Sequence, residues 1–300
     1  MEETKKIWFD GKFVDWSNAK IHVLTHTLHY SSGVFEGIRA YYTEKGTAVF
    51  RLSEHVKRLF YSASCLKIKI PFSQQEIERA ILETIKVNEL KEGYIRPIAF
   101  FGYGKMGLHP VGAPVNVAIA VWPWGAYLGK EAVTVKISKY IRISPKSTIA
   151  DAKICGHYTN SILASLEAKS AGFDEALLLD CEGNVAEGPG ENIFLVKNGK
   201  LFTPAKGSIL PGITRDSVIK IAKDLGIDVT EKKISVKELK STDEAFFTGT
   251  AVEVCAIKKI DDVIIGDGKI GEITKKIKTV FEEAVRGKRK EYFKWLTFVK

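Results

Sequence analysis

The sequence predicts an α/β protein of two domains, and three observations support this. The chain has 300 residues, of which 45% are hydrophobic, so it is long and apolar enough for two ordinary cores. Short runs with strand periodicity alternate with amphipathic helical stretches in both halves. Pro123, Gly125 and Gly129 cluster between apolar runs, which is typical of a linker. We therefore expect a smaller domain over residues 1–122, an interdomain loop over 123–132 and a larger domain over 133–300.

The first domain mixes strands with two helices. IWFDGKFVD (7–15) has the pattern of a hairpin, and GVFEGIRAYY, TAVFRL, YIRPIAFF and PVNVAIAVW have that of strands. Ser53 is expected to cap a helix that ends before Pro71, and the capping box Ser73-Gln74-Gln75-Glu76 opens a second helix that runs towards Gly93. The apolar stripe of the first helix is Val56, Leu59, Phe60, Ala63 and Leu66.

The second domain begins with the strand VTVKISKYIRI, followed by a loop and a helix over 160–171 that Gly172 stops. Strands EALLLD, NVAE and NIFLV follow, and Asn198-Gly199 predicts a hairpin turn into KLFTP. Pro211-Gly212 and Gly226 delimit a helix over 213–225. AFFTGTAVEVCAI is two strand segments hinged at Thr248-Gly249-Thr250.

Composition argues against several classes of protein. The N-terminus is charged and lacks an apolar signal region, and no apolar run approaches the roughly 18–20 residues of a membrane span, so we expect a cytoplasmic protein. Its cysteines, Cys65, Cys155, Cys181 and Cys255, form no C-x-x-C, which predicts reduced thiols and no metal site. The net charge of +9 and the basic run RGKRKEYFKW raise the possibility of nucleic acid or membrane binding. Because Lys and Glu are interleaved throughout, a solvated surface explains the charge better, and we expect neither partner.

GYGKMG at 102–107 matches the dinucleotide-binding pattern G-x-G-x-x-G and follows a predicted strand. That motif works only where a helix begins at the glycines and its N–H groups hold a pyrophosphate. The continuation LHPVGAPV places Pro110, Gly112 and Pro114 where the helix would run. The motif therefore predicts a glycine-rich turn and argues against a nicotinamide-dependent dehydrogenase.

Three other features suit a different cofactor. Lys153 lies among small and apolar residues, where an amine has room to form a Schiff base, although a surface lysine is the simpler reading. Glu187 leads into Gly188-Pro189-Gly190 and is either a buried carboxylate or an exposed turn residue. Ile213-Thr214 and Gly249-Thr250 both present backbone N–H groups and a hydroxyl, which suit a phosphate. An amine, a carboxylate and a phosphate cradle match the aldehyde carbon, ring nitrogen and phosphate ester of pyridoxal 5'-phosphate.

The sequence resembles the fold-type IV pyridoxal-phosphate transaminases, class IV, and most closely the branched-chain amino acid aminotransferases, over residues 7–285. The stretches that carry the resemblance are THTLHYSSGVFEGIRA, HVKRL, YIRPIAF, PWGAYLG, AKICGHYTNS, VAEGPGENIF, LPGITRDSV and FFTGTA. The resemblance implies a small α/β sandwich domain, a larger pseudobarrel domain with helices, and transfer of the amino group between branched-chain L-amino acids and 2-oxoglutarate by a ping-pong route. It also implies a homo-oligomer, either a dimer or a hexamer of dimers.

The resemblance also assigns roles to residues. Lys153 is the catalytic Schiff-base lysine, Glu187 pairs with the pyridine nitrogen and Tyr158 contacts the phenolic oxygen. The phosphate is held by Arg58, Ile213, Thr214, Gly249 and Thr250. The periodicity of the 53–67 helix by itself places Arg58 outside the apolar stripe, facing solvent.

Substrate residues follow partly from strand alternation. Tyr94, Arg96 and Ile98 share one face of their strand, and Phe35, Gly37 and Arg39 share one face of theirs. An arginine in an apolar strand needs an anionic partner, so Arg96 and Arg39 are candidate substrate ligands. By resemblance, Tyr94 and the turn at Thr250-Ala251 receive the α-carboxylate. Tyr30, Arg96 and Tyr127 receive a side-chain carboxylate, and Phe35, Gly37 and Trp124 line the apolar part.

Alternatives within the same fold type are a D-amino acid or (R)-amine transaminase and an aminodeoxychorismate lyase, and outside enzymes a basic binding protein. The chain departs from its relatives at His157, where they often have Asn. It also has LHP at 108–110 in place of a V-N-P-like stretch expected to reach a neighbouring subunit's pocket. Both departures concern the range of substrates more than the reaction.

Overall fold

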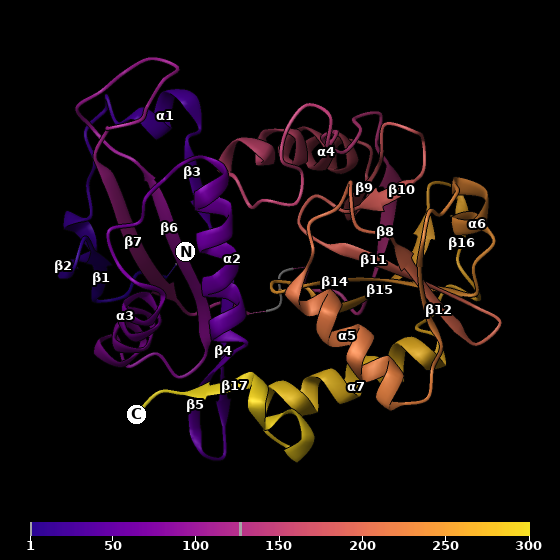
Figure 1. The fold of residues 1–300 in the computed structure, drawn as a ribbon. Coiled ribbons are helices and arrows are strands. Elements are labelled where there is room, and N and C mark those ends of the chain that lie inside the picture. Colours follow the sequence, from indigo (N-terminus) through magenta and orange to yellow (C-terminus); the bar gives the residue numbers. More distant parts are fainter. Residues whose placement is uncertain (1, 126–127) are drawn as a thin grey trace. The chain divides into compact units, whose positions relative to one another are not determined.

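The computed structural model describes residues 2–125 and 128–300, and the chain forms two compact units (Figure 1). The first unit comprises the chain up to Gly125 together with Ala152–Gly156 and Ala284–Lys300. The second comprises the remaining described residues, up to Glu283. The predicted linker at 123–132 lies where the chain first leaves one unit for the other. The segments 152–156 and 284–300, which we expected in the second domain, pack with the first unit.

The first unit is built on an eight-stranded sheet with the order β17-β5-β4-β6-β7-β1-β2, and β3 pairs with β6. Its pairings are antiparallel, including the predicted hairpin of β1 and β2. Asp10 and Gly11 both have positive φ in that hairpin turn. The strands are β1 Lys6–Phe9, β2 Lys12–Asp15, β3 Gly33–Phe35, β4 Ile38–Thr43, β5 Gly46–Phe50, β6 Gly93–Phe101, β7 Val115–Trp122 and β17 Leu296–Phe298.

The sequence GVFEGIRAYY, predicted as one strand, forms two strands that pair successively with β6 and are interrupted at Glu36 and Gly37. The interruption lies opposite Pro97, whose carbonyl accepts a hydrogen bond from the Glu36 N–H at 2.9 Å. A residue of an antiparallel strand directs its N–H and C=O to the same neighbour, and proline has no N–H to donate. Pro97 therefore cannot continue the ladder at this point, and the backbone of residues 36–37 leaves the strand.

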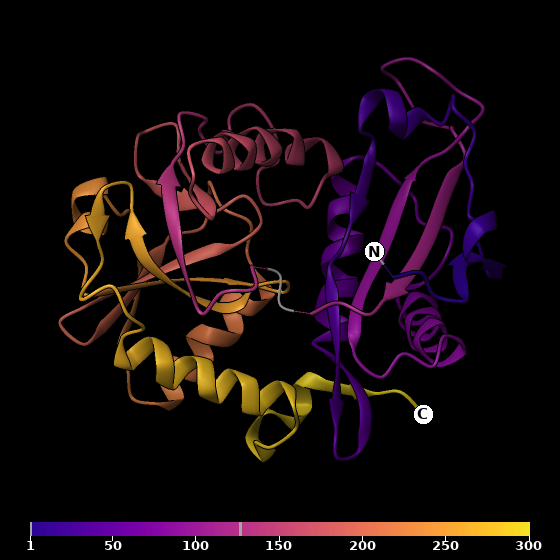
Figure 2. The same cartoon turned by 180° about the vertical axis from the view of Figure 1, so that it is seen from behind.

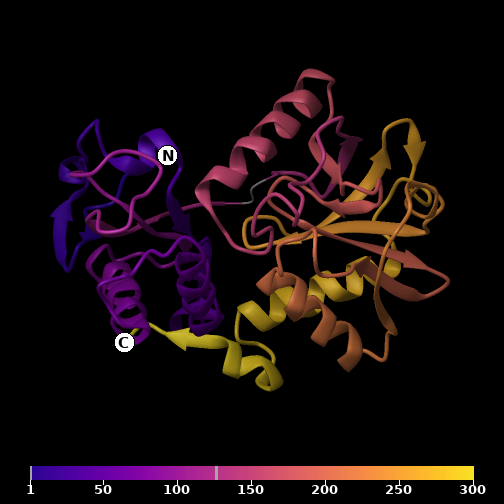
Figure 3. The ribbon, with the colours of Figure 1, turned by 45° about the horizontal axis from the view of Figure 1, so that its top comes forward.

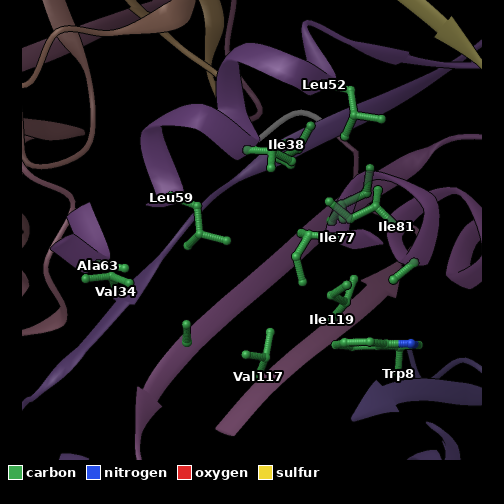
Figure 4. Packing of buried hydrophobic residues seen from close by; sticks show 14 of the residues in the cluster. Trp8, Val34, Ile38, Leu52, Leu59, Ala63, Ile77, Ile81, Val117 and Ile119 are labelled. Atoms are coloured by element: carbon green, nitrogen blue, oxygen red, sulfur yellow. The ribbon is translucent and has the colours of Figure 1, made fainter. Parts of the chain in front are cut away.

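Two helices of 14 residues, α2 Leu52–Cys65 and α3 Gln74–Val87, pack against each other and against the sheet. The apolar stripe predicted for the first of them is confirmed at Val56, Leu59 and Ala63, which are buried. Figure 4 shows Leu59 and Ala63 facing side chains of the strands, among them Val34 and Val117. The shorter helices are α1 His26–Tyr30, η1 Trp16–Asn18 and η3 Lys290–Trp295.

The two helix starts differ in how well local sequence predicted them. The capping box of α3 is confirmed, because Ser73 accepts from the Glu76 N–H and Glu76 accepts from the Ser73 N–H. The cap expected at Ser53 is wrong. The N-cap is Arg51, two residues earlier. It has a left-handed φ of 52°, and its N–H donates to the Trp295 carbonyl at 2.6 Å. Contact with a distant segment thus sets this helix start.

The second unit contains a closed sheet, which confirms the predicted barrel-like architecture (Figure 2). Six strands, in the order β10-β9-β8-β15-β14-β11, form the closed part, since β10 pairs with both β9 and β11. Strands β12, β13 and β16 extend it. Their bounds are β8 Ala132–Ile137, β9 Glu175–Leu179, β10 Val185–Glu187, β11 Asn192–Lys197, β12 Lys200–Pro204, β13 Val229–Lys232, β14 Glu244–Gly249, β15 Glu253–Ile260 and β16 Val263–Ile264.

Helices cover this barrel on two sides. Helix α4 Tyr158–Ser170 packs on β8 and β9, and α5 Ile213–Asp224 packs on β13 and β14. Figure 3 shows α4 on the side of the barrel away from α5 and α7 Glu272–Val285. Helix α4 starts two residues earlier than predicted, directly after η2 Cys155–His157. The remaining helix is α6 Val236–Lys240.

The loop between β6 and β7 contains the GYGKMG motif, and it holds no helix. Gly104 and Gly107 have φ of 124° and 100°, as expected of a glycine-rich turn and not of a pyrophosphate-binding helix start. In the part of the chain that the structure describes, no helix has the length and apolarity needed to cross a membrane. The same residues contain no cluster of three His, Cys, Asp or Glu side chains arranged for a metal ion.

Candidate active site

Lys153 lies in a short segment that packs with the first unit, and its backbone is held from two sides. Its N–H donates to the hydroxyl of Ser62 on α2 at 2.9 Å, and its carbonyl accepts from the N–H of Phe35 at the end of β3 at 3.2 Å. The ammonium nitrogen lies 5.1 Å from the centre of the Phe35 ring, and the side chain is half-buried. Lys153 is therefore not a fully exposed lysine, and its backbone has a fixed position within the first unit.

One face of α2 connects this lysine to a buried ionic network. His55, Arg58 and Ser62 are spaced i, i+3 and i+7, so they lie on the same side of the helix. Arg58 donates to both oxygens of Glu36, from Nε at 2.6 Å and from Nη2 at 2.9 Å. His55 Nδ1 lies 2.7 Å from one of the same oxygens. Glu36, in the interruption between β3 and β4, is fully buried.

The pattern-based expectation that Arg58 faces solvent is wrong, since only 11% of its side chain is exposed. Helix periodicity identifies the face that packs on apolar residues, but it cannot show that an adjacent face packs on a carboxylate. Glu36 supplies that carboxylate because Pro97 interrupts the strand that carries it.

Electrostatics fix the protonation states in this network. Burial would raise the pKa of Glu36, but the charge of Arg58 and the hydrogen bonds from Arg58 and His55 outweigh it and hold that pKa well below its usual range. Burial lowers the pKa of His55, against the opposing influence of Glu36, and the charges of Arg58 and Lys153 lower it further. Glu36 is therefore a carboxylate, and His55 is a neutral imidazole whose Nδ1–H donates to it. The influence of Lys153 on His55 also places the lysine within electrostatic reach of the network.

The second feature of the first unit is an aromatic wall, formed by three rings that surround the guanidinium of Arg96. The guanidinium of Arg96 lies 4.7 Å from the ring centre of Phe35, 5.4 Å from that of Tyr94 and 6.0 Å from that of Trp122. Its Nε is buried and has no hydrogen-bond partner among the described residues. A buried donor without a partner is costly, so this site is suited to an anionic ligand.

Gly37, Trp124 and Arg39 complete this wall. A β-carbon on Gly37 would lie 1.8 Å from the Tyr94 hydroxyl oxygen, so glycine allows that ring its position. The Trp124 ring packs edge-on against Tyr94, with 4.5 Å between the ring centres. Arg39 Nη2 donates to the carbonyls of Trp124 and Gly125 at 3.0 and 3.3 Å. Arg39 therefore holds the segment that carries Trp124, a contact that alternation alone did not predict.

Tyr30 is the last residue of α1, is 40% exposed, and stacks near His26 with 4.5 Å between the ring centres. In this unit it is not part of the wall around Arg96. Tyr127, the other predicted ligand of a side-chain carboxylate, lies outside the described residues.

In the second unit, Glu187 is a buried carboxylate at the end of β10, and the alternative of an exposed turn residue is wrong. Three donors hold it. Arg142 Nε donates to one carboxylate oxygen, Asn192 Nδ2 donates to the other at 2.9 Å, and the Leu210 N–H lies 3.0 and 3.2 Å from the two. Arg142 Nη2 also donates to the carbonyl of Ala150 at 3.2 Å. The carboxylate thus has a fixed position and a fixed orientation.

The two predicted phosphate turns lie next to this carboxylate within the second unit. Asn192, beside Glu187, also faces Thr248 across β11 and β14, and β14 ends at Gly249. Helix α5 begins three residues after Leu210, and its N-cap, Gly212, provides no side-chain cap. A β-carbon on Gly212 would lie 2.0 Å from Asn192 Oδ1, which explains the need for glycine there. The hydroxyl of Thr248 is buried and has no hydrogen-bond partner among the described residues.

A helix start without a side-chain cap presents backbone N–H groups and a positive dipole end, which favour an anion. Ile213 and Thr214 form this start and are buried, while Thr250 and Ala251 in the neighbouring turn are half-buried. Tyr158 is the first residue of α4 and is half-buried. His157, directly before it, shares a hydrogen bond with the Thr148 hydroxyl at 2.9 Å.

Each unit therefore gathers its own set of the predicted residues. The first unit gathers Phe35, Gly37, Arg39, Arg58, Tyr94, Arg96, Trp124 and Lys153, and the second gathers Glu187, Ile213, Thr214, Gly249, Thr250 and Ala251, with Tyr158 at the start of α4.

Sequence reasoning missed the residues that hold these side chains: Glu36 and His55 around Arg58, and Arg142 and Asn192 around Glu187. A signal was present for two of them. Glu36 interrupts the apolar run VFEGI, and Arg142 interrupts YIRI, so the argument that singled out Arg96 applies to both. Nothing in the local sequence distinguishes His55 or Asn192 from solvent-facing residues.

Comparison with known proteins agrees with the α/β fold and its barrel-like sheet. Residues 33–260 match the family model described as amino-transferase class IV. This covers well over half of the chain, and the protein belongs to the amino-transferase class IV family.

Relatives within this family are similar over nearly their whole length. The chain is 47% identical to a branched-chain-amino-acid aminotransferase of Pseudomonas aeruginosa, with 98% of this chain and 97% of that protein covered. It is 43% identical to the enzyme of the same name from Escherichia coli, with 98% of each chain covered. Among solved structures, a branched-chain amino acid aminotransferase from T.th., complexed with N-(5'-phosphopyridoxyl)-L-glutamate, has a TM-score of 0.97, 46% identity and full coverage of both chains. The Thermoproteus uzoniensis branched-chain aminotransferase with norvaline has a TM-score of 0.96 and 43% identity, with 99% of this chain and 100% of that chain covered.

Proposed function

We propose that this protein is a pyridoxal-phosphate-dependent transaminase that moves the amino group between L-leucine, L-isoleucine or L-valine and 2-oxoglutarate. The observation that carries the proposal is the pair of fixed groups that this cofactor needs. Lys153 is an amine whose backbone is pinned by Ser62 and Phe35, and Glu187 is a buried carboxylate held by three donors. Similarity to branched-chain aminotransferases supports the proposed preference for branched-chain substrates.

The described residues include groups that suit each of the three recognition points of pyridoxal phosphate. Lys153 supplies the amine for the aldehyde carbon, and Glu187 the carboxylate for the ring nitrogen. Arg58, the uncapped start of α5 at Ile213 and Thr214, and the turn at Gly249 and Thr250 supply donors for the phosphate ester. Tyr158 supplies a hydroxyl for the phenolic oxygen.

When bound, the cofactor supplies an electron sink that lets a proton leave the α-carbon of the amino acid. Lys153 would hold the cofactor through its amine, and a substrate amine would displace it there. Its amine, once free, would act as general base towards the proton on the substrate Cα and as general acid when that proton is returned to the cofactor's aldehyde carbon. Glu187 would keep the ring nitrogen protonated, and its three donors stop the carboxylate from turning away.

Substrate selection is assigned to the aromatic wall of the first unit and to the turn at 250–251 of the second. Phe35, Gly37 and Trp124 line the space for an aliphatic side chain, and Arg96 receives the side-chain carboxylate of glutamate. Tyr94, Thr250 and Ala251 receive the α-carboxylate. The orphaned Nε of Arg96 supports this assignment, because a carboxylate would provide the acceptor that it lacks.

Two experiments test the proposal. Borohydride reduction of the holoenzyme, followed by peptide mapping, should place the pyridoxyl label on Lys153, and a label on another lysine would overturn that assignment. Amino-group transfer to 2-oxoglutarate should be fast from L-leucine and L-isoleucine and slow from D-alanine or an (R)-aryl amine. The opposite preference would indicate a D-amino acid or (R)-amine transaminase, and elimination of pyruvate from aminodeoxychorismate would indicate the lyase.

We also propose that the first unit binds a second copy of this chain, as the sequence resemblance implies. Val23 and Leu28 are 70% and 59% exposed, and Leu108 in the β6–β7 loop is 89% exposed. A hydrogen bond of 2.8 Å from the His26 ring to the Gly107 carbonyl holds the two segments together. Exposed apolar side chains on two adjoining segments suit a contact between copies, and we name them the apolar patch. Leu108→Glu should lower the mass seen by analytical ultracentrifugation, and an unchanged mass would remove this patch from the interface. The expected cytoplasmic location remains a prediction.

A further inference from the structure

Glu36 is a charged group in a place where a charge is costly. Its side chain is fully buried between β3 and β4, in an otherwise apolar stretch. Burial of a carboxylate is tolerated only where partners replace its hydration. Here Arg58 and His55 together donate to both carboxylate oxygens at 2.6–2.9 Å.

The way in which Glu36 binds Arg58 determines the orientation of the guanidinium. A guanidinium is planar and carries five N–H donors in a rigid fork. Glu36 engages the edge formed by Nε and Nη2, one donor to each oxygen. This two-point contact sets both the direction and the plane of the fork. His55 donates to the oxygen shared with Nη2 and stops the carboxylate from rotating.

The same elements also hold Lys153. Phe35, the residue before Glu36, donates its N–H to the Lys153 carbonyl, and Ser62, one turn beyond Arg58 on α2, accepts from the Lys153 N–H. The positions of Arg58 and of the Lys153 backbone are therefore both set by α2 and by residues 35–36 of the first unit. A cofactor bound by its aldehyde carbon and by its phosphate needs such a fixed separation.

We propose that Glu36, oriented by His55, is a positioning residue that aims Arg58 at the phosphate ester of the cofactor. This inference rests on the proposed function. Glu36 itself makes no contact with the cofactor and acts only by orienting the guanidinium of Arg58. The competing explanation is that Glu36 and Arg58 form an ion pair that stabilises the fold and does not serve binding.

The experiment compares two probes of the apoprotein, pyridoxal 5'-phosphate and pyridoxal, which lacks the phosphate. Glu36→Gln keeps the shape of the side chain and removes its charge. Its affinity for pyridoxal 5'-phosphate should fall about 10- to 100-fold, the scale on which losing the partner of a ligand weakens binding. Its affinity for pyridoxal should stay within about threefold, because that probe makes no use of Arg58. Glu54→Gln, which removes an ion pair between α2 and Arg51 away from the network, is the matched control and should change neither affinity.

A double-mutant cycle separates positioning from general stabilisation. In an Arg58→Ala background, Glu36→Gln should cause no further loss of affinity for pyridoxal 5'-phosphate. Equal losses for both probes, or an undiminished loss in the Arg58→Ala background, would show that Glu36 serves the fold alone. If Glu36→Gln does not fold, Glu36→Asp retains the charge and withdraws it by one methylene. Glu36→Asp should lower the affinity for pyridoxal 5'-phosphate but not that for pyridoxal. Wild-type affinity for both probes would overturn the inference.

The two proposals fail in different ways. If wild-type apoprotein does not bind pyridoxal 5'-phosphate, the proposed function itself is wrong. If the wild type binds it and folded Glu36→Gln binds both probes equally well, only the positioning role is wrong.

Discussion

The hydroxyl oxygen of Tyr94 lies 1.8 Å from the point that a β-carbon on residue 37 would occupy, and Cζ of the same ring lies 2.7 Å from it. Gly37 follows the interruption at Glu36, and β4 then runs beside β6, which carries Tyr94. The Tyr94 ring itself packs against Trp122 and Trp124, with ring centres 5.2 and 4.5 Å apart. The absence of a side chain at residue 37 is therefore what allows Tyr94 to point into the aromatic wall.

This relationship predicts the effect of Gly37→Ala. The Tyr94 ring must leave its position, at a cost in stability of about 1–3 kcal/mol, the range for overpacking. If Tyr94 receives the α-carboxylate, turnover of L-leucine and L-glutamate should fall together, because every substrate has that group. Thermal unfolding and half-reaction rates measure the two effects. Adding Tyr94→Phe should restore part of the stability, since it removes the closest contact, and no recovery would contradict the steric explanation.

Arg96→Leu should separate recognition of glutamate from general damage. If Arg96 binds the side-chain carboxylate, kcat/KM for L-glutamate should fall by a factor equivalent to about 2–5 kcal/mol, roughly 30- to 5,000-fold. L-Leucine makes no such bond and should lose less than about tenfold, through repacking of Phe35 and Tyr94 around the new side chain.

Half-reaction rates for both amino acids on the same folded variant provide this comparison. Arg286→Leu, which removes a partly exposed ion pair with Glu92, is the control and should leave both rates close to wild type. Parallel losses for the two substrates, with a lower melting temperature, would assign Arg96 a structural role.

Glu187→Gln should keep the cofactor but lower kcat by roughly 10²-fold or more, the scale of losing one preorganised charged partner. A neutral amide cannot hold a proton on the ring nitrogen, and its NH₂ group would face the donors Arg142, Asn192 and Leu210. Absorbance of the bound cofactor and single-turnover rates with L-leucine measure retention and chemistry separately. Glu182→Gln, at an exposed ion pair with Lys233, is the matched control. Near-normal turnover would remove Glu187 from the proposed mechanism.

Burial of His55 should make the free energy of unfolding sensitive to acid. Its pKa is lowered by burial from an ordinary value of 6.5, so below about that pH the unfolded chain binds a proton that the folded protein does not. The free energy of unfolding should therefore fall as the pH drops below 6.5, with a slope of up to about 1.4 kcal/mol per pH unit from this group. His55→Gln should show a shallower fall between about pH 6.5 and 5 in urea unfolding. The pKa of Glu36 is also lowered, so the stability that Glu36 contributes is present at neutral pH and is lost only as the pH falls through its folded pKa. A wild-type slope in the variant would exclude His55 as the source.

Local chemistry explains why several elements could be predicted without a structure. The Ser73 capping box satisfies N–H groups of its own helix, and the turn at Asn198-Gly199 adopts two positive φ angles of 50° and 74° in successive residues. In each case the interacting groups lie within a few residues of each other. The helix expected at Ser53 was misplaced because its start depends on a hydrogen bond from Arg51 to Trp295, far away in the chain.

The sequence by itself determined the two-part α/β organisation, the family resemblance and the residue types that suit this cofactor, because periodicity, turn residues and motif spacing are local properties of the chain. Only the tertiary structure decided which groups hold those residues. Arg58 needs Glu36, which lies 22 positions earlier in the chain, and Glu187 needs Arg142, which lies 45 positions earlier. A local pattern shows that a residue is charged and which face of its element is apolar. It does not show which distant segment packs on the other face, and a buried charge is stable only when such a segment supplies its partner.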